Sequence, residues 1–291
     1  MSRSIRPRRS VLYMPGSNPR ALEKARTLPA DGLIFDLEDA VAPDAKNLAR
    51  TQITDALKAG GYGHRETIIR VNGLQTPWGH ADLVAAATSG ADGVLLPKVG
   101  SADAVHQALS VLDQAGAPED LPVWAMMETA RGMLHAEEIA GASPRLTGFV
   151  MGTSDLAKEL HASHTSLRLP MITALGLCLL AGRAFGLTLL DGVHLDLADE
   201  EGYAASCQQG LDLGFDGKTL IHPKQIEPAN RIFAPDDAAI AQAEKIIAAH
   251  EVAAAEGKGV VVVDGRLVEN LHVEDAKRQM QLAEAIRQMT T

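Results

Sequence analysis

The sequence predicts an α/β protein, a (β/α)₈ TIM barrel followed by a C-terminal helix–hairpin–helix appendage. Eight short β-rich apolar runs alternate with longer stretches of helical composition. The length of 291 residues accommodates one barrel of about 250 residues with an extension. The glycine fingerprint G-x-G-x-x-G of open doubly wound sheets does not occur in the sequence. We therefore favour the closed barrel over an open sheet.

The expected strands are apolar on both faces, which is typical of a parallel sheet covered by helices. In chain order they are Ser10–Met14, Leu33–Leu37, Thr67–Val71, Gly93–Leu96, Val123–Met127, Gly148–Met151, Thr188–Asp191 and Gly217–Ile221. Helix-start residues follow several of them. Asn18-Pro19 indicates the first helix, Pro43-Asp44 the second, and Ser101 with Asp103 the fourth.

The pattern changes after Pro235, so we predict a barrel domain over residues 1–235 and an appendage over residues 236–291. An alanine-rich helix is expected from Asp236 to Glu256, and a β run from Gly259 to Val263. The turn Asp264-Gly265 and a last helix from about Val273 follow. A hairpin between two helices is too small for a core of its own, so we expect it to pack on its own barrel or on a neighbouring subunit.

Composition narrows the class of protein. The chain carries 27 basic and 37 acidic residues, a net charge of −10, without the clustered Lys and Arg typical of nucleic-acid binding. Cys178 and Cys207 are too few and too far apart for a disulfide framework or a thiolate metal site. The apolar stretch from Met171 to Leu190 is interrupted by Arg183 and glycines, unlike a membrane span. We expect a soluble cytoplasmic protein without nucleic-acid or membrane partners.

In a barrel, polar residues at the carboxyl ends of the strands face the active-site mouth. Glu128 and Asp155 follow neighbouring strands, so the spacing brings two carboxylates to one rim. Such a pair suits Mg²⁺, although acids at these positions could equally cap the helices that follow. A glycosidase-type carboxylate pair needs a sugar cleft lined by aromatic side chains, which a content of 3% aromatic residues makes hard to build.

Arg70 ends a run of β-branched residues, where burial of a guanidinium requires an anion. The anion could be a substrate carboxylate, or it could be one of the acids that end the second strand. Those acids are Asp36, Glu38 and Asp39, which could also orient metal-bound waters or Arg70 itself.

The segment Met14–Pro19 brings main-chain N–H groups to a helix start, and Arg20, Lys24 and Arg26 follow. This arrangement favours an anionic phosphate, although a capped helix looks the same in sequence.

Ordered sequence blocks resemble the citrate lyase beta subunit and malyl-CoA lyase family of the HpcH/HpaI aldolase superfamily, from about residue 10 to the appendage. The blocks are Ser10–Ser17 (SVLYMPGS), Gly32–Val41 (GLIFDLEDAV), Ile69–Gly73 (IRVNG), Leu96–Lys98 (LPK), Met127–Gly132 (METARG), Gly152–Leu156 (GTSDL), Gly217-Lys218 and Ile221–Ile226 (IHPKQI). Several blocks in the same order are more specific than any one of them.

The resemblance implies a TIM barrel that uses Mg²⁺ to cleave or form the C–C bond of a short 3-hydroxy-carboxyacyl-CoA. It implies that Glu128 and Asp155 bind the metal and that Arg70 binds substrate. It further implies that Arg20 and Lys24 bind the CoA phosphates.

The chain departs from the family pattern in the appendage. Many members carry there an Asp that closes over the mouth of a neighbouring subunit and acts as the catalytic acid/base. Here the block is Gly265–Leu271 (GRLVENL), so Glu269 stands where the family has that Asp. The carboxylate is one methylene longer, and a displacement of about 1 Å can cost about a hundredfold in rate.

We therefore expect a Mg²⁺-dependent acyl-CoA lyase acting by a retro-aldol or Claisen mechanism on malyl-, methylmalyl-, citramalyl- or citryl-CoA. The alternatives are a thioesterase that acts on malyl-CoA, and a citrate lyase beta-like subunit that needs a carrier-protein partner. By resemblance the protein is expected to be a homotrimer or a homohexamer.

Overall fold

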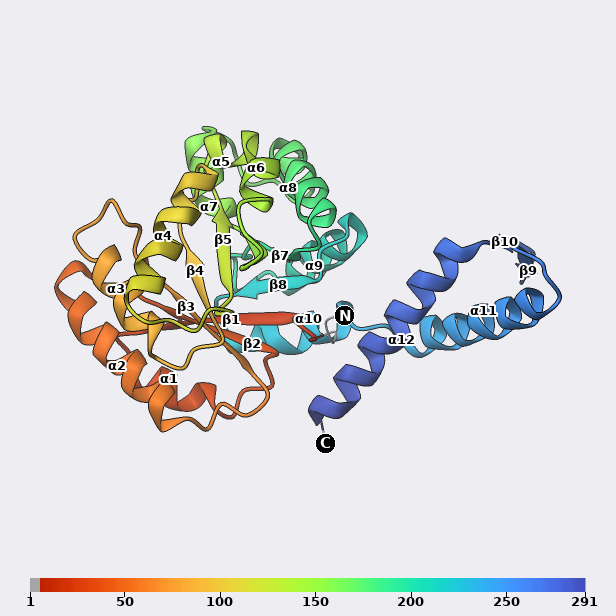
Figure 1. The fold of residues 1–291 in the computed structure, drawn as a ribbon, viewed down its shortest axis with the longest axis horizontal. Helices are drawn as coiled ribbons and strands as arrows, with labels where there is room; N and C mark the ends of the chain where they lie inside the picture. Colours follow the sequence, from red (N-terminus) through yellow and green to blue (C-terminus); the bar gives the residue numbers. More distant parts are fainter. Residues whose placement is uncertain (1–5, 291) are drawn as a thin grey trace. The chain divides into compact units, whose positions relative to one another are not determined.

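The computed structural model describes residues 6–290 (Figure 1). They form two compact units that divide between Arg231 and Ile232, close to the boundary expected at residue 235. The larger unit is Arg8–Arg231, and the smaller one contains the chain from Ile232 onward.

The larger unit is a closed barrel of eight parallel strands in sequential order, with β8 pairing with β1 (Figure 1). The strands are β1 (Ser10–Pro15), β2 (Gly32–Asp36), β3 (Glu66–Arg70), β4 (Gly93–Leu96), β5 (Val123–Met127), β6 (Leu146–Met151), β7 (Thr188–Asp191) and β8 (Gly217–Leu220). The predicted (β/α)₈ barrel is confirmed, and every expected strand is present with its ends shifted by at most two residues.

Helices surround the strands, as the short apolar runs on both strand faces require (Figure 1). The α-helices of this unit are α1 (Pro19–Ala25), α2 (Lys46–Ala59), α3 (Gly79–Ala87), α4 (Ala102–Gln114), α5 (Ala130–Leu134), α6 (Ala136–Ala140), α7 (Thr153–Glu159), α8 (Ile172–Ala184), α9 (Glu200–Leu213) and α10 (Ile226–Ile232). Short 3₁₀ turns occur at Pro43–Ala45, Leu169–Met171 and Pro223–Gln225. The expected helix start at Asn18-Pro19 is confirmed, because the Asn18 side chain accepts a hydrogen bond from the Ala21 N–H.

Buried apolar side chains fill the middle of the barrel. They are Val11, Ile34, Ile68, Leu95, Trp124, Met126, Val150 and Leu190. At the amino end of the strands, Arg8 stacks on the Trp124 ring at 5.2 Å and donates to Glu66 and Thr188. These contacts close the amino end of the barrel, so we look for the site at the carboxyl end, where barrel enzymes carry their chemistry.

Asp191 ends β7 but does not join that mouth. Successive strand residues point to opposite faces, so Asp191 points away from the interior that contains Leu190. Its carboxylate is buried between Lys218 Nζ at 2.7 Å and Arg168 Nη1 at 2.6 Å. Burial alone would raise the pKa of Asp191, but the two cations lower it. The expectation that polar strand ends gather at the mouth is therefore wrong for Asp191.

The smaller unit contains the expected helix–hairpin–helix. Helices α11 (Asp237–Ala255) and α12 (Asn270–Thr290) flank the antiparallel strands β9 (Val261–Val263) and β10 (Arg266–Val268). The turn Asp264-Gly265 has positive φ at both residues, as the type I′ turn of a two-residue hairpin requires. Helix α12 begins three residues before the expected Val273, because its first turn starts at the Glu269 carbonyl.

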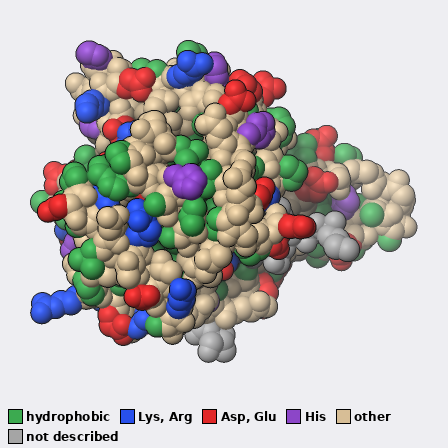
Figure 2. Space-filling model, turned by 60° about the vertical axis from the view of Figure 1, so that its left-hand side comes forward, with side chains coloured by type: hydrophobic (Ala, Val, Ile, Leu, Met, Phe, Trp, Pro, Cys, Tyr) green, Lys and Arg blue, Asp and Glu red, His purple; other side chains and the backbone are tan. Residues whose placement is uncertain are grey.

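The acidic excess is not gathered into one patch on the face displayed in Figure 2, where acidic and basic side chains are scattered among uncharged ones. Among the described residues, no helix is long and apolar enough to cross a membrane.

The Asp191–Lys218 pair predicts a stability effect. Lys218→Met leaves a fully buried carboxylate with one partner fewer, so the free energy of unfolding should fall by about 3 kcal/mol. Lys58→Met removes an exposed lysine from α2 and should change it by less than about 0.5 kcal/mol. Urea unfolding measures both, and equal stability of the two variants would contradict the assignment of this pair to the core.

Candidate active site

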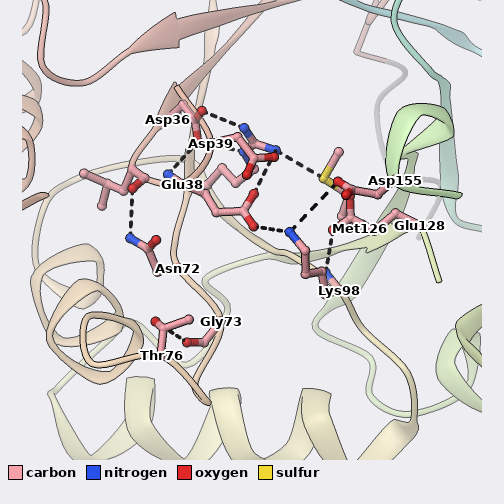
Figure 3. Close-up of polar contacts among 12 residues, drawn as sticks. Asp36, Glu38, Asp39, Asn72, Gly73, Thr76, Lys98, Met126, Glu128 and Asp155 are labelled. Carbon is pink, nitrogen blue, oxygen red and sulfur yellow. Dashed lines mark hydrogen bonds and ion pairs between the residues drawn. The ribbon is translucent and has the colours of Figure 1, made fainter. Parts of the chain in front are cut away.

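Polar side chains from β2 to α7 converge at the carboxyl end of the barrel (Figure 3). Strands β2 and β3 end in Asp36 and Arg70, which the sheet register places side by side. Glu128 follows β5 directly, and Asp155 lies in the first turn of α7. The predicted site residues on the barrel strands therefore come together at one rim.

Asp36 holds the Arg70 guanidinium by two hydrogen bonds. Arg70 Nε donates to Asp36 Oδ1 at 2.7 Å, and Nη2 donates to Oδ2 at 2.6 Å. The guanidinium also lies 4.8 Å from the centroid of the Tyr13 ring. Burial opposes its charge, but the Asp36 carboxylate raises the pKa of Arg70. Arg70 is thus a fixed cation whose Nη1 is left for other partners.

Arg70 Nη1 faces Glu38 and Asp39, at 3.0 Å from Glu38 Oε2 and 3.6 Å from Asp39 Oδ2. Burial raises the pKa of Glu38, and the charges of Arg70 and Lys98 oppose that rise. Of the two interpretations of Arg70 left open by the sequence, the structure contains the ion pair with the acids of β2. Binding of a substrate carboxylate by Arg70 stays a prediction.

Hydrogen bonds from two side chains hold the backbone of the segment after β2. Lys46 Nζ, from α2, donates to the main-chain carbonyls of Leu37 at 2.8 Å and Glu38 at 2.7 Å. Asn72 Nδ2 donates to the Leu37 carbonyl at 2.8 Å and to Asp82 Oδ2 at 2.6 Å. These contacts fix the backbone that presents Glu38 to Arg70.

Glu128 is completely buried and does not cap a helix, because Thr129 accepts the N–H of Gly132 at the start of α5. Glu128 Oε1 accepts the main-chain N–H of Lys98 at 2.7 Å, whereas Oε2 is buried without a hydrogen-bond partner. Burial raises the pKa of Glu128 to about 8. The alternative that Glu128 acts as a helix cap is therefore wrong.

The absence of a side chain at Gly152 leaves space for the Glu128 carboxylate. A Cβ atom at this position would lie 2.5 Å from Glu128 Oε2, so any other residue would displace the carboxylate. Gly152 also precedes α7 directly, which brings Asp155 toward the same mouth.

Asp155 is partly exposed and lies in the first turn of α7, where its charge is favoured by the helix dipole. Its Oδ2 is 4.0 Å from Lys98 Nζ, across the mouth from α7. Both the dipole interpretation and a ligand role therefore fit the position of Asp155.

The donor set fits a hard divalent cation. Glu128 offers a buried carboxylate oxygen without a partner, and Asp155 offers a second carboxylate with access to solvent. Within the described residues, no group of three or more His, Cys, Asp or Glu side chains forms a metal site. Mg²⁺ is commonly bound through one or two carboxylates and retains several waters, so two protein ligands are sufficient for it.

Three further predicted site residues do not take part in the contacts described above. Arg20 is exposed in the first turn of α1, close to the rim, because the preceding Gly16 N–H donates to the Asp36 carbonyl at 2.9 Å. Lys24 is exposed one turn further along α1. Glu269 belongs to the smaller unit, where its side chain is exposed and its N–H donates to His272 Nδ1. The roles proposed for these three residues stay predictions.

Sequence reasoning gave no role to Lys98, which the structure places at the centre of the site. Its Nζ donates to Glu38 Oε1 while its own N–H donates to Glu128 (Figure 3). The only signal was its position at a strand end in the block Leu96–Lys98. Its backbone φ of 52° is uncommon for lysine, so the residue type did not indicate this conformation.

Residues 9–223 match the model of the HpcH/HpaI aldolase/citrate lyase family, a range that includes every site residue on the barrel strands. The chain belongs to this family. The resemblance expected from the sequence blocks is therefore confirmed.

Full-length relatives of this aldolase/citrate lyase family include two with different names, both from Cereibacter sphaeroides. The chain is 56% identical over 286 residues to a (3S)-malyl-CoA thioesterase, with 98% of each chain covered. It is 36% identical to an L-malyl-CoA/beta-methylmalyl-CoA lyase, with 97% of this chain and 96% of the relative covered.

Among solved structures, the chain resembles CitE from Mycobacterium tuberculosis in complex with magnesium, acetoacetate and coenzyme A. The TM-score is 0.76 at 31% identity, with 94% of this chain and 97% of CitE covered.

The buried Glu128 predicts a pH dependence of stability. Its pKa is about 8 in the folded protein and about 4.5 when unfolded, so the folded state binds the extra proton between these values. The free energy of unfolding should therefore fall as the pH rises from 5 to 8, by roughly 3 to 4 kcal/mol.

Glu128→Gln removes the titrating group, so its urea-unfolding free energy in EDTA should lack this decline. The exposed Glu119→Gln serves as the matched control and should follow the wild type. Parallel pH curves for wild type and Glu128→Gln would contradict the assigned pKa.

Proposed function

We propose that the protein is a Mg²⁺-dependent enzyme that hydrolyses the thioester of a short 3-hydroxy-carboxyacyl-CoA such as (3S)-malyl-CoA. The site observation that carries the proposal is the buried, unpartnered Glu128 Oε2 beside Asp155 and a fixed arginine. Identity to a malyl-CoA thioesterase is 56%, against 36% to a malyl-CoA lyase, which favours hydrolysis. The lyase activity first expected from the sequence becomes the second candidate.

Glu128 and Asp155 are the residues that would hold Mg²⁺. The solved CitE complex contains magnesium and coenzyme A, which supports both ligands for this chain. When bound, the ion supplies a positive charge that stabilises negative charge developing on substrate oxygens. Lys98 contributes by fixing one oxygen of Glu128 and leaving the other for the ion.

Arg70 would bind the carboxylate of the acyl group. Asp36 occupies Nε and Nη2, so the guanidinium presents Nη1 to the mouth. Because the pair with Asp36 holds the guanidinium in one orientation, little ordering remains to be done when substrate binds. The acyl carboxylate would share Nη1 with Glu38 or displace it.

Arg20 and Lys24 would contact the phosphates of CoA. Both are exposed on α1, next to the strand that carries Tyr13. Their cationic side chains match the negative charge of the nucleotide portion, which lies outside the reacting centre.

Carbon–carbon bond cleavage is the second candidate, because relatives of this family carry lyase names at full-length coverage. That reaction needs a proton donor for the enolate carbon, and Glu269 is the residue predicted for it. Its delivery from a neighbouring subunit would require the expected homotrimer or homohexamer.

The two reactions release different products from malyl-CoA. Hydrolysis breaks the C–S bond, adds water, and gives malate, free CoA thiol and a proton. Cleavage gives acetyl-CoA and glyoxylate without free thiol. We expect the pure protein with (3S)-malyl-CoA and Mg²⁺ to release thiol and malate in equal amounts, and to release little glyoxylate.

Glu128→Gln should lower kcat/KM for this release by at least about a hundredfold, whereas Glu119→Gln should leave it unchanged. Glyoxylate in place of thiol would assign the lyase reaction instead. Absence of both products from the lone chain would overturn the proposal and favour a subunit that depends on a carrier-protein partner.

A further inference from the structure

Lys98 follows β4 with its backbone in the left-handed region, at φ 52°. Such a conformation costs a non-glycine residue free energy and persists where surrounding contacts hold it. Here the main-chain N–H of Lys98 donates to Glu128 Oε1 at 2.7 Å. The strained backbone is thus coupled to the orientation of the buried Glu128 carboxylate.

The side chain of the same residue turns back into the acidic cluster. Lys98 Nζ bonds to Glu38 Oε1 and lies 4.0 Å from Asp155 Oδ2 (Figure 3). About one third of the side chain is exposed, so water screens its charge only in part. One residue therefore orients Glu128 through its backbone and contacts two further carboxylates through its ammonium.

The Lys98 ammonium balances carboxylate charge at the mouth of the barrel. The second fixed cation at the mouth, Arg70, is already paired with Asp36. Lys98 is therefore the main counter-charge for Asp155 and shares Glu38 with Arg70. A divalent cation held by Glu128 and Asp155 would lie near the Lys98 ammonium, which is already paired with Asp155. The ion would compete with the ammonium for this carboxylate, and the two positive charges would repel each other.

We propose that Lys98 sets the affinity of the site for the divalent cation by opposing it. Its main chain prepares Glu128 as a ligand, and its ammonium competes with the ion for the carboxylates around it. The inference rests on the metal site of the proposed function. It predicts that the lysine weakens metal binding, whereas a residue needed only to keep the acids together would strengthen it.

The test is isothermal titration of the protein with MgCl₂ and with MnCl₂, without substrate. Lys98→Met removes the ammonium and should bind either ion at least about tenfold more tightly than the wild type. Lys98→Gly should do the same, because glycine accepts a φ of 52° and keeps the N–H that orients Glu128. It therefore guards against a folding defect in the methionine variant.

Two controls complete the series. Lys98→Arg keeps the charge and should not bind the ions more tightly than the wild type. Lys58→Met removes an exposed lysine from α2 and should leave the dissociation constant unchanged.

Wild-type binding that Glu128→Gln abolishes, combined with equal or weaker binding by Lys98→Met and Lys98→Gly, would overturn this inference and leave the metal site intact. Absence of saturable binding to the wild type would overturn the metal site and this inference together.

Discussion

Buried charge at the mouth of the barrel has to be paired, and the pair of Asp36 with Arg70 is where that pairing begins. A guanidinium whose side chain is only 7% exposed is stable there because Asp36 meets it with two hydrogen bonds. The remaining Nη1 then attracts Glu38, and Glu38 in turn bonds to Lys98. The orientation of each charged side chain thus depends on the one before it.

This series of contacts ends at the carboxylates of Glu128 and Asp155, the two proposed metal ligands. Lys98 fixes one oxygen of Glu128 by its main chain and approaches Asp155 by its ammonium. The result is a buried carboxylate with one oxygen satisfied and one without a partner, which is costly unless a ligand compensates it. The unpartnered oxygen lowers the free energy of unfolding. A cation that binds to this oxygen would recover that loss as part of its binding free energy.

The sequence predicted the barrel and the rim well, because strand periodicity and the carboxyl-end rule depend on local pattern and topology. It could not choose between ligand and cap for Glu128, since that depends on which neighbour reaches the carboxylate. It assigned no role to Lys98, because a lysine in the sequence does not indicate a positive φ. The carboxyl-end rule is wrong for Asp191 because side chains alternate along a strand, and Asp191 points to the face opposite that of Leu190. The position of Glu269 relative to the barrel is a question of assembly, which local pattern does not address.

The central claim is that Glu128 and Asp155 hold the divalent cation. Anomalous diffraction from crystals of the protein grown with MnCl₂ tests it directly, because manganese scatters anomalously and oxygen does not. The account predicts one strong anomalous peak within about 2.2 Å of both Glu128 and Asp155 carboxylates, absent from crystals of Glu128→Gln. A peak held by other residues, or a peak that persists in Glu128→Gln, would contradict it.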